Sequence, residues 1–182
     1  MPNWCTFGMN IRFSDKRSAQ ACYSELMERK RAADARHEGF QFGPDEQYLF
    51  DTDMDFVDDL EISIYGDVKW GFDNDMVAAF FQYAIDKGWN ISEAVCKYEE
   101  ISCCIYGKWI YNGDNKTLTD WRVLESYINS LYENATQEQQ DSDFWLGYVE
   151  EKAFNAPDDQ WEIADSYQFD QPKKESDNGK EA

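Results

Sequence analysis

Apolar and polar residues alternate with a period of two in five stretches of this chain. These stretches are residues 5–13, 48–56 and 60–70, followed by two more at roughly 90–98 and 101–111. Successive side chains of a β-strand point to opposite faces, so an alternating stretch is typical of a strand with one buried face. The pattern therefore predicts five half-buried strands.

Between and after these stretches, apolar residues recur at intervals of three and four, which is the spacing of one face of a helix. Polar capping residues precede two of these segments, and a glycine ends one of them. The four predicted helices run from the Ser14-Asp15 cap to about residue 36, from the Asp73 cap to Gly88, from about residue 118, and over residues 142–153.

The order of the first six elements, β-α-β-β-α-β, is that of the split-βαβ, ferredoxin-like motif. We therefore expect an α+β fold with a ferredoxin-like antiparallel sheet over residues 1–111, including one extra strand. An acidic helical addition over 112–170 is expected to pack on this sheet, and the polar tail over 171–182 to be disordered. Both helices of the motif lie on one face of the sheet, so its other face stays open unless the addition covers it.

Composition narrows the class of protein. The 182 residues include 37 acidic and 17 basic side chains, for a net charge of −20, yet 42% of the residues are apolar and 16% aromatic. That apolar content is typical of a folded domain rather than a disordered acidic chain. A direct nucleic-acid binder needs a basic surface, which this charge balance opposes. No apolar run approaches the ~20 residues of a membrane span and no signal peptide is recognisable, so we expect a soluble cytoplasmic protein.

Three short motifs within residues 1–111 carry a resemblance to a known family. They are the opening Met1-Pro2-Asn3-Trp4-Cys5-Thr6, the segment Gly66-Asp67-Val68-Lys69-Trp70, and the stretch from Tyr98-Glu99-Glu100 to Gly107. In these motifs the chain resembles the YubB ferredoxin-like domain family of plasmid- and phage-encoded proteins. The resemblance implies a ferredoxin-like fold and an origin in a mobile element, with the host cytoplasm as the compartment if a phage encodes it. It implies no catalytic residues, because none are established for the family.

The excess negative charge lies in two segments of the chain. Residues 45–75 contain eleven acidic side chains and only Lys69 as a basic one. Residues 133–170 contain eleven acidic side chains against Lys152. The rest of the chain is close to neutral, so these two segments carry the whole imbalance.

Three aspartates share one face of a predicted strand, because Asp51, Asp53 and Asp55 occupy alternate positions. Neighbours in such a row are about 6.6 Å apart, roughly twice the 3.4 Å spacing of phosphates along one DNA strand. Where the next strand pairs with this one as a hairpin, Glu61 and Asp67 join the same face. The row is therefore predicted to imitate the charge spacing of a nucleic-acid backbone.

A crowded acidic surface repels itself, and a basic partner relieves that repulsion. The leading hypothesis is thus a nucleic-acid mimic that inhibits a host defence or DNA-binding protein, such as a restriction or CRISPR-type effector, by occupying its basic groove. The partner-binding residues that it predicts are Asp51, Asp53, Asp55, Asp58, Asp59, Glu61, Asp67, Glu150, Glu151, Asp158 and Asp159. Three other interpretations stay open: an acidic face that only keeps the protein in solution, a non-enzymatic interaction module that binds through apolar and aromatic surface, and a small hydrolase or nuclease with a divalent-ion-dependent activity.

Motifs for catalysis and metal binding are weak in this sequence. The five cysteines form no C-x-x-C pair and His37 is the single histidine, so zinc-ligand spacing is absent. A calcium loop starting at Asp51 would need glycine and glutamate where Phe56 and Ile62 stand. No glycine-rich phosphate-binding loop is present. We therefore expect a protein that is not an enzyme and has no catalytic residues, no metal and no cofactor.

Overall fold

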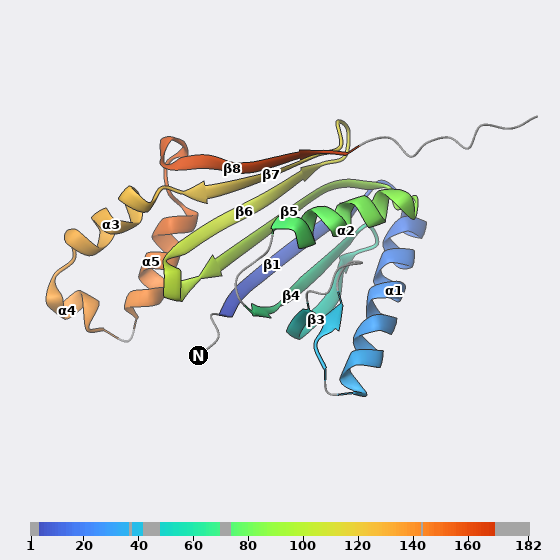
Figure 1. The fold of residues 1–182 in the computed structure, drawn as a ribbon, viewed down its shortest axis with the longest axis horizontal. Helices are drawn as coiled ribbons and strands as arrows, with labels where there is room; N and C mark the ends of the chain where they lie inside the picture. Colours follow the sequence, from blue (N-terminus) through green and yellow to red (C-terminus); the bar gives the residue numbers. More distant parts are fainter. Residues whose placement is uncertain (1–3, 37, 42–47, 70–73, 143, 170–182) are drawn as a thin grey trace, which may run out of the picture.

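The computed structural model describes residues 4–36, 38–41, 48–69, 74–142 and 144–169 (Figure 1). The elements in chain order are β1 (Trp4–Phe13), α1 (Lys16–Asp34), β2 (Phe40–Gln41), β3 (Tyr48–Asp58), β4 (Glu61–Lys69), α2 (Asn74–Asp86), β5 (Ile91–Glu100), the 3₁₀ turn η1 (Ile101–Cys103), β6 (Ile105–Asn112), β7 (Thr117–Val123), α3 (Glu125–Glu133), α4 (Gln137–Gln140), α5 (Trp145–Phe154), the 3₁₀ turn η2 (Asp158–Gln160) and β8 (Trp161–Gln168). The predicted cap at Asp73, the histidine at position 37 and the predicted disordered tail over 171–182 lie outside the described residues.

All the described strands belong to one antiparallel sheet of eight strands, in the order β2-β3-β4-β1-β5-β6-β7-β8. β1 lies in the middle of the sheet and pairs with β4 on one side and with β5 on the other. From β5 onward each strand pairs with the next along the chain; β6 follows β5 and β7 follows β6 after short connections, whereas α3, α4 and α5 lie between β7 and β8. The α+β class predicted from the sequence is confirmed.

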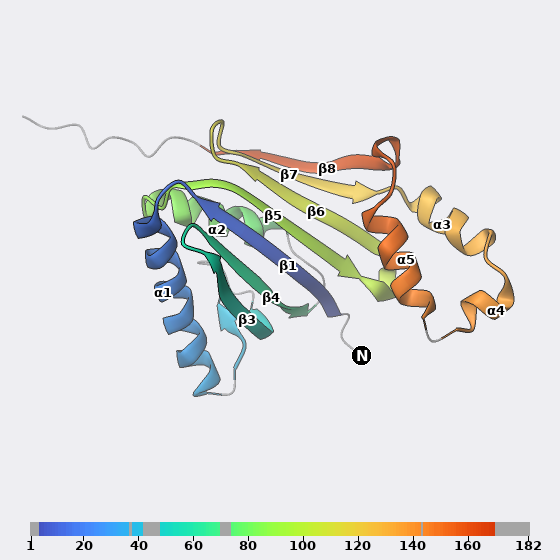
Figure 2. The same ribbon diagram turned by 180° about the vertical axis from the view of Figure 1, so that it is seen from behind.

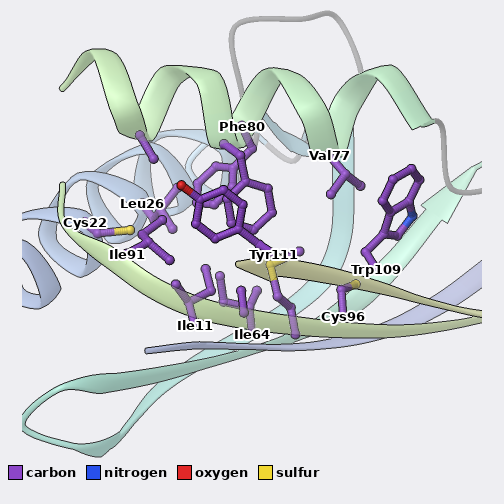
Figure 3. Packing of buried hydrophobic residues seen from close by; sticks show 14 of the residues in the cluster. Ile11, Cys22, Leu26, Ile64, Val77, Phe80, Ile91, Cys96, Trp109 and Tyr111 are labelled. Carbon is purple, nitrogen blue, oxygen red and sulfur yellow. The ribbon is translucent and has the colours of Figure 1, made fainter. Parts of the chain in front are cut away.

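One face of the sheet is covered by α1 and α2 (Figure 1). Strand residues on this face are buried, among them Ile11 of β1 and Ile64 of β4, as their period-two positions predicted. Figure 3 shows Val77 and Phe80 of α2 pointing towards these strands, with Leu26 of α1 beside them. Burying one such side chain stabilises the fold by about 1.5–3 kcal/mol, so this layer is the main core.

Asp15 caps the start of α1, in agreement with the predicted Ser14-Asp15 cap. Its carboxylate accepts hydrogen bonds from the Ser18 backbone nitrogen at 2.8 Å and from the Ser18 hydroxyl at 2.9 Å. The Asn90 side-chain nitrogen donates a third bond at 2.8 Å. Because Asn90 directly precedes β5, this cap also holds the start of α1 against the loop that follows α2.

Two sequence predictions after residue 100 are wrong. Residues 117–123 form β7, where a helix was expected from about residue 118, and α3 begins only at Glu125. The β-branched residues Thr117, Thr119 and Val123 favour a strand there. The strand expected over 101–111 begins only at Ile105, because η1 and the left-handed residue after it separate it from β5.

The C-terminal addition is therefore not wholly helical, since it also extends the sheet by β7 and β8. Most β8 side chains are exposed, and the alternation of Trp161, Ile163 and Tyr167 is interrupted by Asp165, so β8 was not predicted. The helices α3 and α5 form a second apolar cluster with the end of β6, and its buried members are Tyr106, Val123, Ile128, Trp145, Val149 and Ala153.

We call the face of the sheet opposite α1 and α2 the outer face. In Figure 2, α5 lies in front of the ends of β5 and β6, whereas α2 lies behind the sheet. The C-terminal addition thus covers the outer face at one end only. The outward side chains of β1, β3 and β4 are left uncovered by these helices, and this is where the acidic residues of the hairpin β3–β4 lie.

Candidate functional site

The aspartates of β3 do not form the regular row that the sequence predicted. The pairing of β3 with β4 shifts between Phe50 and Asp53, so that two residues of β3 stand opposite Gly66 alone. This is a β-bulge, and Asp51 within it has a φ of 43°, outside the extended region. The bulge interrupts the even spacing, which is kept only between Asp53 and Asp55.

Glycine is required at position 66 for this bulge to form. A Cβ atom there would lie 2.8 Å from the Thr52 hydroxyl oxygen and 3.0 Å from the Phe50 carbonyl oxygen. With glycine present, Thr52 turns into the protein and is buried, whereas the aspartates on either side of it are exposed. The bulge therefore returns Asp53 to the outer face, where it stands opposite Tyr65 of β4.

Basic residues form ion pairs with the acids at the turn between β3 and β4. Arg12 of β1 forms ion pairs with Asp58 at 3.5 Å and with Glu61, and it also lies 3.7 Å from Glu93. Lys16 pairs with Asp59. The acids at this turn thus hold the hairpin onto β1 and the start of α1, although two basic side chains face four acidic ones and negative charge remains.

Within the described part of the chain, the acidic residues of the β3–β4 hairpin away from its turn form no ion pairs with Arg12 or Lys16. Asp67 accepts a hydrogen bond from the Thr6 hydroxyl at 2.9 Å. Among the described residues, no basic side chain forms an ion pair with Asp51, Asp53 or Asp55. These three aspartates are exposed, and although Lys30 of α1 lines the same hollow as Asp51 and Asp53, it pairs with Asp34, so the three are the part of the predicted site that stays open to a partner.

The second acidic segment does not join this surface as the sequence predicted. Asp158 and Asp159 lie in η2, directly before β8, which is separated from β3 by five intervening strands. Since neighbouring strands lie about 4.8 Å apart, the two groups are roughly 25–30 Å from each other. Of the two glutamates of α5, Glu150 reaches the outer face and Glu151 does not line it. A single continuous acidic surface built from both segments is not formed.

A groove of about 400 Å³ lies between α5 and the outer face. Its walls come from four elements far apart in the sequence. They include Tyr65 of β4, Val95, Lys97 and Glu99 of β5, and Glu150 and Phe154 of α5. No alternation or spacing in the sequence brings these side chains together, and sequence reasoning missed the groove.

The floor of this groove is shaped by Gly8 of β1. A Cβ atom at position 8 would lie 3.0 Å from Cε1 of Tyr65, so the Tyr65 ring packs directly over the glycine backbone. The Tyr65 side chain nevertheless stays 57% exposed. One side of its ring is therefore held by the sheet and the rest is offered to solvent within the groove.

Two carboxylates and one ammonium group define the charge of the groove. Oxygen Oε2 of Glu99 is buried and has no hydrogen-bond partner among the described residues. Burial raises the pKa of Glu99, and the negative charge of Glu150 raises it further. Lys97 holds its Nζ 5.4 Å from the centre of the Phe154 ring. When Glu99, Glu150 and Lys97 are all ionised, the groove carries a net charge of −1.

An aromatic cluster is exposed at the end of the molecule formed by α3, α4 and α5. Phe144 is 85% exposed, and Leu146 and Tyr148 are also largely exposed. The Trp145 ring stacks on Tyr148 at 5.4 Å and meets Tyr132 edge-on at 5.3 Å. Apolar side chains presented in this way are typical of a protein-interaction surface.

Neither a metal site nor a membrane-spanning helix is evident in the described part of the chain. No three His, Cys, Asp or Glu side chains there are grouped so that they could hold a metal ion. No helix in that part has both the length and the apolar character needed to cross a bilayer.

Comparisons of this chain with protein-family models, with curated proteins and with solved structures find no match. The resemblance to the YubB family therefore stays an expectation from three short motifs. The function has to be argued from the geometry of the outer face.

Proposed function

We propose that this protein binds a basic, nucleic-acid-binding host protein through the outer face of β3 and β4, in place of nucleic acid. The observation that carries the proposal is the exposed aspartate group of β3, Asp51, Asp53 and Asp55, which has no ion-pair partner among the described residues. A host defence nuclease, such as a restriction or CRISPR-type effector, has a basic groove of the required kind. By filling that groove the protein inhibits the partner.

Electrostatics supports this proposal in two ways. Like charges held on one strand repel each other, and a cationic groove removes that repulsion on binding. The same field steers a basic partner towards the acidic strand and raises the association rate. Direct binding of RNA or DNA by this face is disfavoured, because sheet surfaces that bind RNA combine stacking aromatics with a positive surface potential, and here the phosphates would meet aspartates.

The arrangement of the first strands supports a ferredoxin-like core for the molecule. β1, β3, β4 and β5 are adjacent in the order β3-β4-β1-β5, with α1 and α2 packed on one face, as the β-α-β-β-α-β motif requires. β6, β7 and β8 extend this core at its β5 edge. In this interpretation the open face of the core supplies the acidic surface, and the addition supplies α5 at its border.

Charge reversal at the aspartate group tests the proposal. Host lysate is passed over immobilised protein at about 0.1 M and about 1 M salt, between which the Debye length falls from about 10 Å to about 3 Å. The wild type should retain a nucleic-acid-binding protein at low salt only, and should displace labelled DNA from it. Asp51→Lys, Asp53→Lys and Asp55→Lys combined should weaken this binding by at least about tenfold, since each exposed ion pair contributes about 0.2–1 kcal/mol and reversal adds repulsion.

A matched variant distinguishes the effect of losing a specific binding surface from the effect of a change in net charge. Asp158→Lys, Asp159→Lys and Glu162→Lys combined change the net charge equally, but at the opposite edge of the sheet. This control should bind like the wild type. Equal loss in both triple variants, or a retained partner that does not bind nucleic acid, contradicts the proposal.

The aromatic cluster supports a second function, that of an interaction module working through apolar surface. The supporting observation is Phe144, whose side chain is 85% exposed beside the stacked Trp145 and Tyr148 rings. A complex made through this cluster should survive high salt and be weakened by Phe144→Ser. A complex that is lost at high salt and unaffected by Phe144→Ser argues for the acidic surface instead.

A further inference from the structure

We propose, building on the function proposed above, that the groove between α5 and the outer face receives an arginine side chain of the basic partner. The groove borders the uncovered part of the sheet, because Tyr65 in its wall stands directly opposite Asp53 of β3. A partner seated on the aspartates of β3 therefore reaches the groove with its neighbouring residues. The groove adds a defined pocket to a surface that otherwise offers only diffuse negative charge.

Charge complementarity favours a cation as the occupant. Glu99 and Glu150 face the groove together with a single basic side chain, Lys97, so one added positive charge balances the three groups. Oxygen Oε2 of Glu99 is buried and accepts no hydrogen bond from the described residues. A buried acceptor without a donor is costly, and a donor brought by the partner would satisfy it once the Glu99 side chain turns this oxygen towards the groove. An anionic occupant such as a phosphate group would instead meet two carboxylates.

The aromatic walls favour arginine over lysine. Tyr65 contacts Gly8 through one edge of its ring and is 57% exposed, and Phe154 also lines the groove. The Phe154 ring already has a cation, Lys97, 5.4 Å from its centre, which shows that this wall accommodates positive charge. A guanidinium group is planar, stacks on aromatic rings and donates paired hydrogen bonds to carboxylates, whereas a lysine ammonium is a compact and strongly hydrated charge.

The volume of the groove is large enough for the side chain of an arginine residue within a polypeptide. At about 400 Å³ the groove lies within the range of small-ligand sites, about 300–1,000 Å³. It opens onto the outer face, where Thr6 and Asn10 of β1 border it with polar atoms. These groups can bind the main chain on either side of an inserted arginine.

Binding of a small arginine probe tests this inference without knowledge of the partner. N-acetyl-arginine methylamide is titrated into the full-length, isotopically labelled protein, and backbone amide shifts are followed by NMR. Shifts that saturate and centre on Tyr65, Lys97 and Glu99 are expected. The matching lysine compound should bind at least about threefold more weakly and the uncharged citrulline compound should not saturate, because each loses part of the paired, charged hydrogen bonding.

Two neighbouring glutamates of α5 provide a matched pair of variants. Glu150→Gln removes one charge from the groove and should weaken the probe about five- to tenfold, as expected for a lost charge-assisted hydrogen bond. Glu151→Gln makes the same chemical change on the next residue, outside the groove, and should leave probe binding unchanged. Equal effects of the two variants, equal binding of the citrulline compound, or shifts centred elsewhere would overturn the inference.

The failure of this inference can be told apart from failure of the proposed function. If the wild type captures a nucleic-acid-binding protein through Asp53 and Asp55 but the arginine probe does not bind, the groove assignment is wrong and the function stands. If the probe binds in the groove but charge reversal on β3 leaves partner capture unchanged, the arginine site stands and the mimicry is wrong.

Discussion

Gly107 of β6 is a position where a single added methyl group would clash with a buried tyrosine side chain. It stands opposite Tyr98 of β5, and a Cβ atom at position 107 would lie 2.2 Å from Cζ and 2.4 Å from the hydroxyl oxygen of that tyrosine. The Tyr98 hydroxyl donates a hydrogen bond to Asp120 at 2.8 Å and accepts one from Nε of Arg122 at 3.0 Å. Gly107→Ala therefore has to displace the ring that anchors this network.

The loss in the free energy of unfolding of Gly107→Ala has two contributions. Forcing a methyl group into a filled site costs about 1–3 kcal/mol. Moving Tyr98 removes a hydrogen bond to the fully buried Asp120 carboxylate, and bonds to charged groups contribute about 1.5–3 kcal/mol. Together they predict a loss of about 3–5 kcal/mol in the free energy of unfolding, a large part of the 5–15 kcal/mol that is typical of a domain.

Urea unfolding followed by tryptophan fluorescence measures this loss. With an m-value of about 2 kcal/mol/M, the midpoint of Gly107→Ala should fall by roughly 2 M. The decisive comparison is the same substitution in a Tyr98→Ala background, where the ring is absent and the added cost should fall below about 1 kcal/mol. An equal cost in both backgrounds would refute the role assigned to the Tyr98 ring.

Four further changes have expected outcomes. Gly147→Ala in α5 meets no atom within 4 Å and should stabilise the protein by about 0.5–1 kcal/mol in thermal unfolding, because glycine is a poor helix former. Ile128→Ala should cost about 2–5 kcal/mol and increase amide exchange in α3 and α5, because this buried side chain holds both helices to β6. The hydrogen bonds that Asp15 accepts as the cap of α1, above all the one from Asn90, lower the pKa of its carboxyl group. Its contribution to stability is therefore present at neutral pH and is lost as the pH falls through that lowered pKa. In urea titrations at several acidic pH values, Asp15→Asn should remove this dependence of the free energy of unfolding on pH. The pKa of Glu99 is shifted in the opposite direction, because burial raises it. Its contribution to stability is therefore favourable at low pH and is lost as the pH rises through the raised pKa. Glu99→Gln should stabilise the protein at neutral pH but not in acid.

Much of the fold could be read from local patterns. The strict alternation of residues 5–13 predicted β1, and all five of its apolar residues are buried. The cap at Asp15 and the helical spacing after it predicted α1 to within about two residues of its start. These features depend on neighbours a few positions apart, so the sequence contains the information directly.

Elements with weak or misleading local patterns were not predicted correctly. β8 is an edge strand whose side chains are mostly exposed, and the alternation of Trp161, Ile163 and Tyr167 is interrupted by Asp165. The apolar spacing after residue 118 fits a helix as well as a strand, and pairing with β6 and β8 decided in favour of β7. Pairing with neighbouring strands overrides a weak local preference for helix.

The sequence by itself determined the composition of the candidate site: the acidic excess, its division into two segments, and the exposure of the β3 aspartates. Only the tertiary structure decided which of those charges remain free. Arg12, which lies on β1, forms ion pairs with Asp58 and Glu61. The sheet order places Asp158 and Asp159 of the second acidic segment at the far edge, whereas Glu150 of the same segment lines the groove that α5 forms with Tyr65. The physical reason is that electrostatic pairing depends on distances between strands that are remote in sequence, and no local pattern encodes those distances.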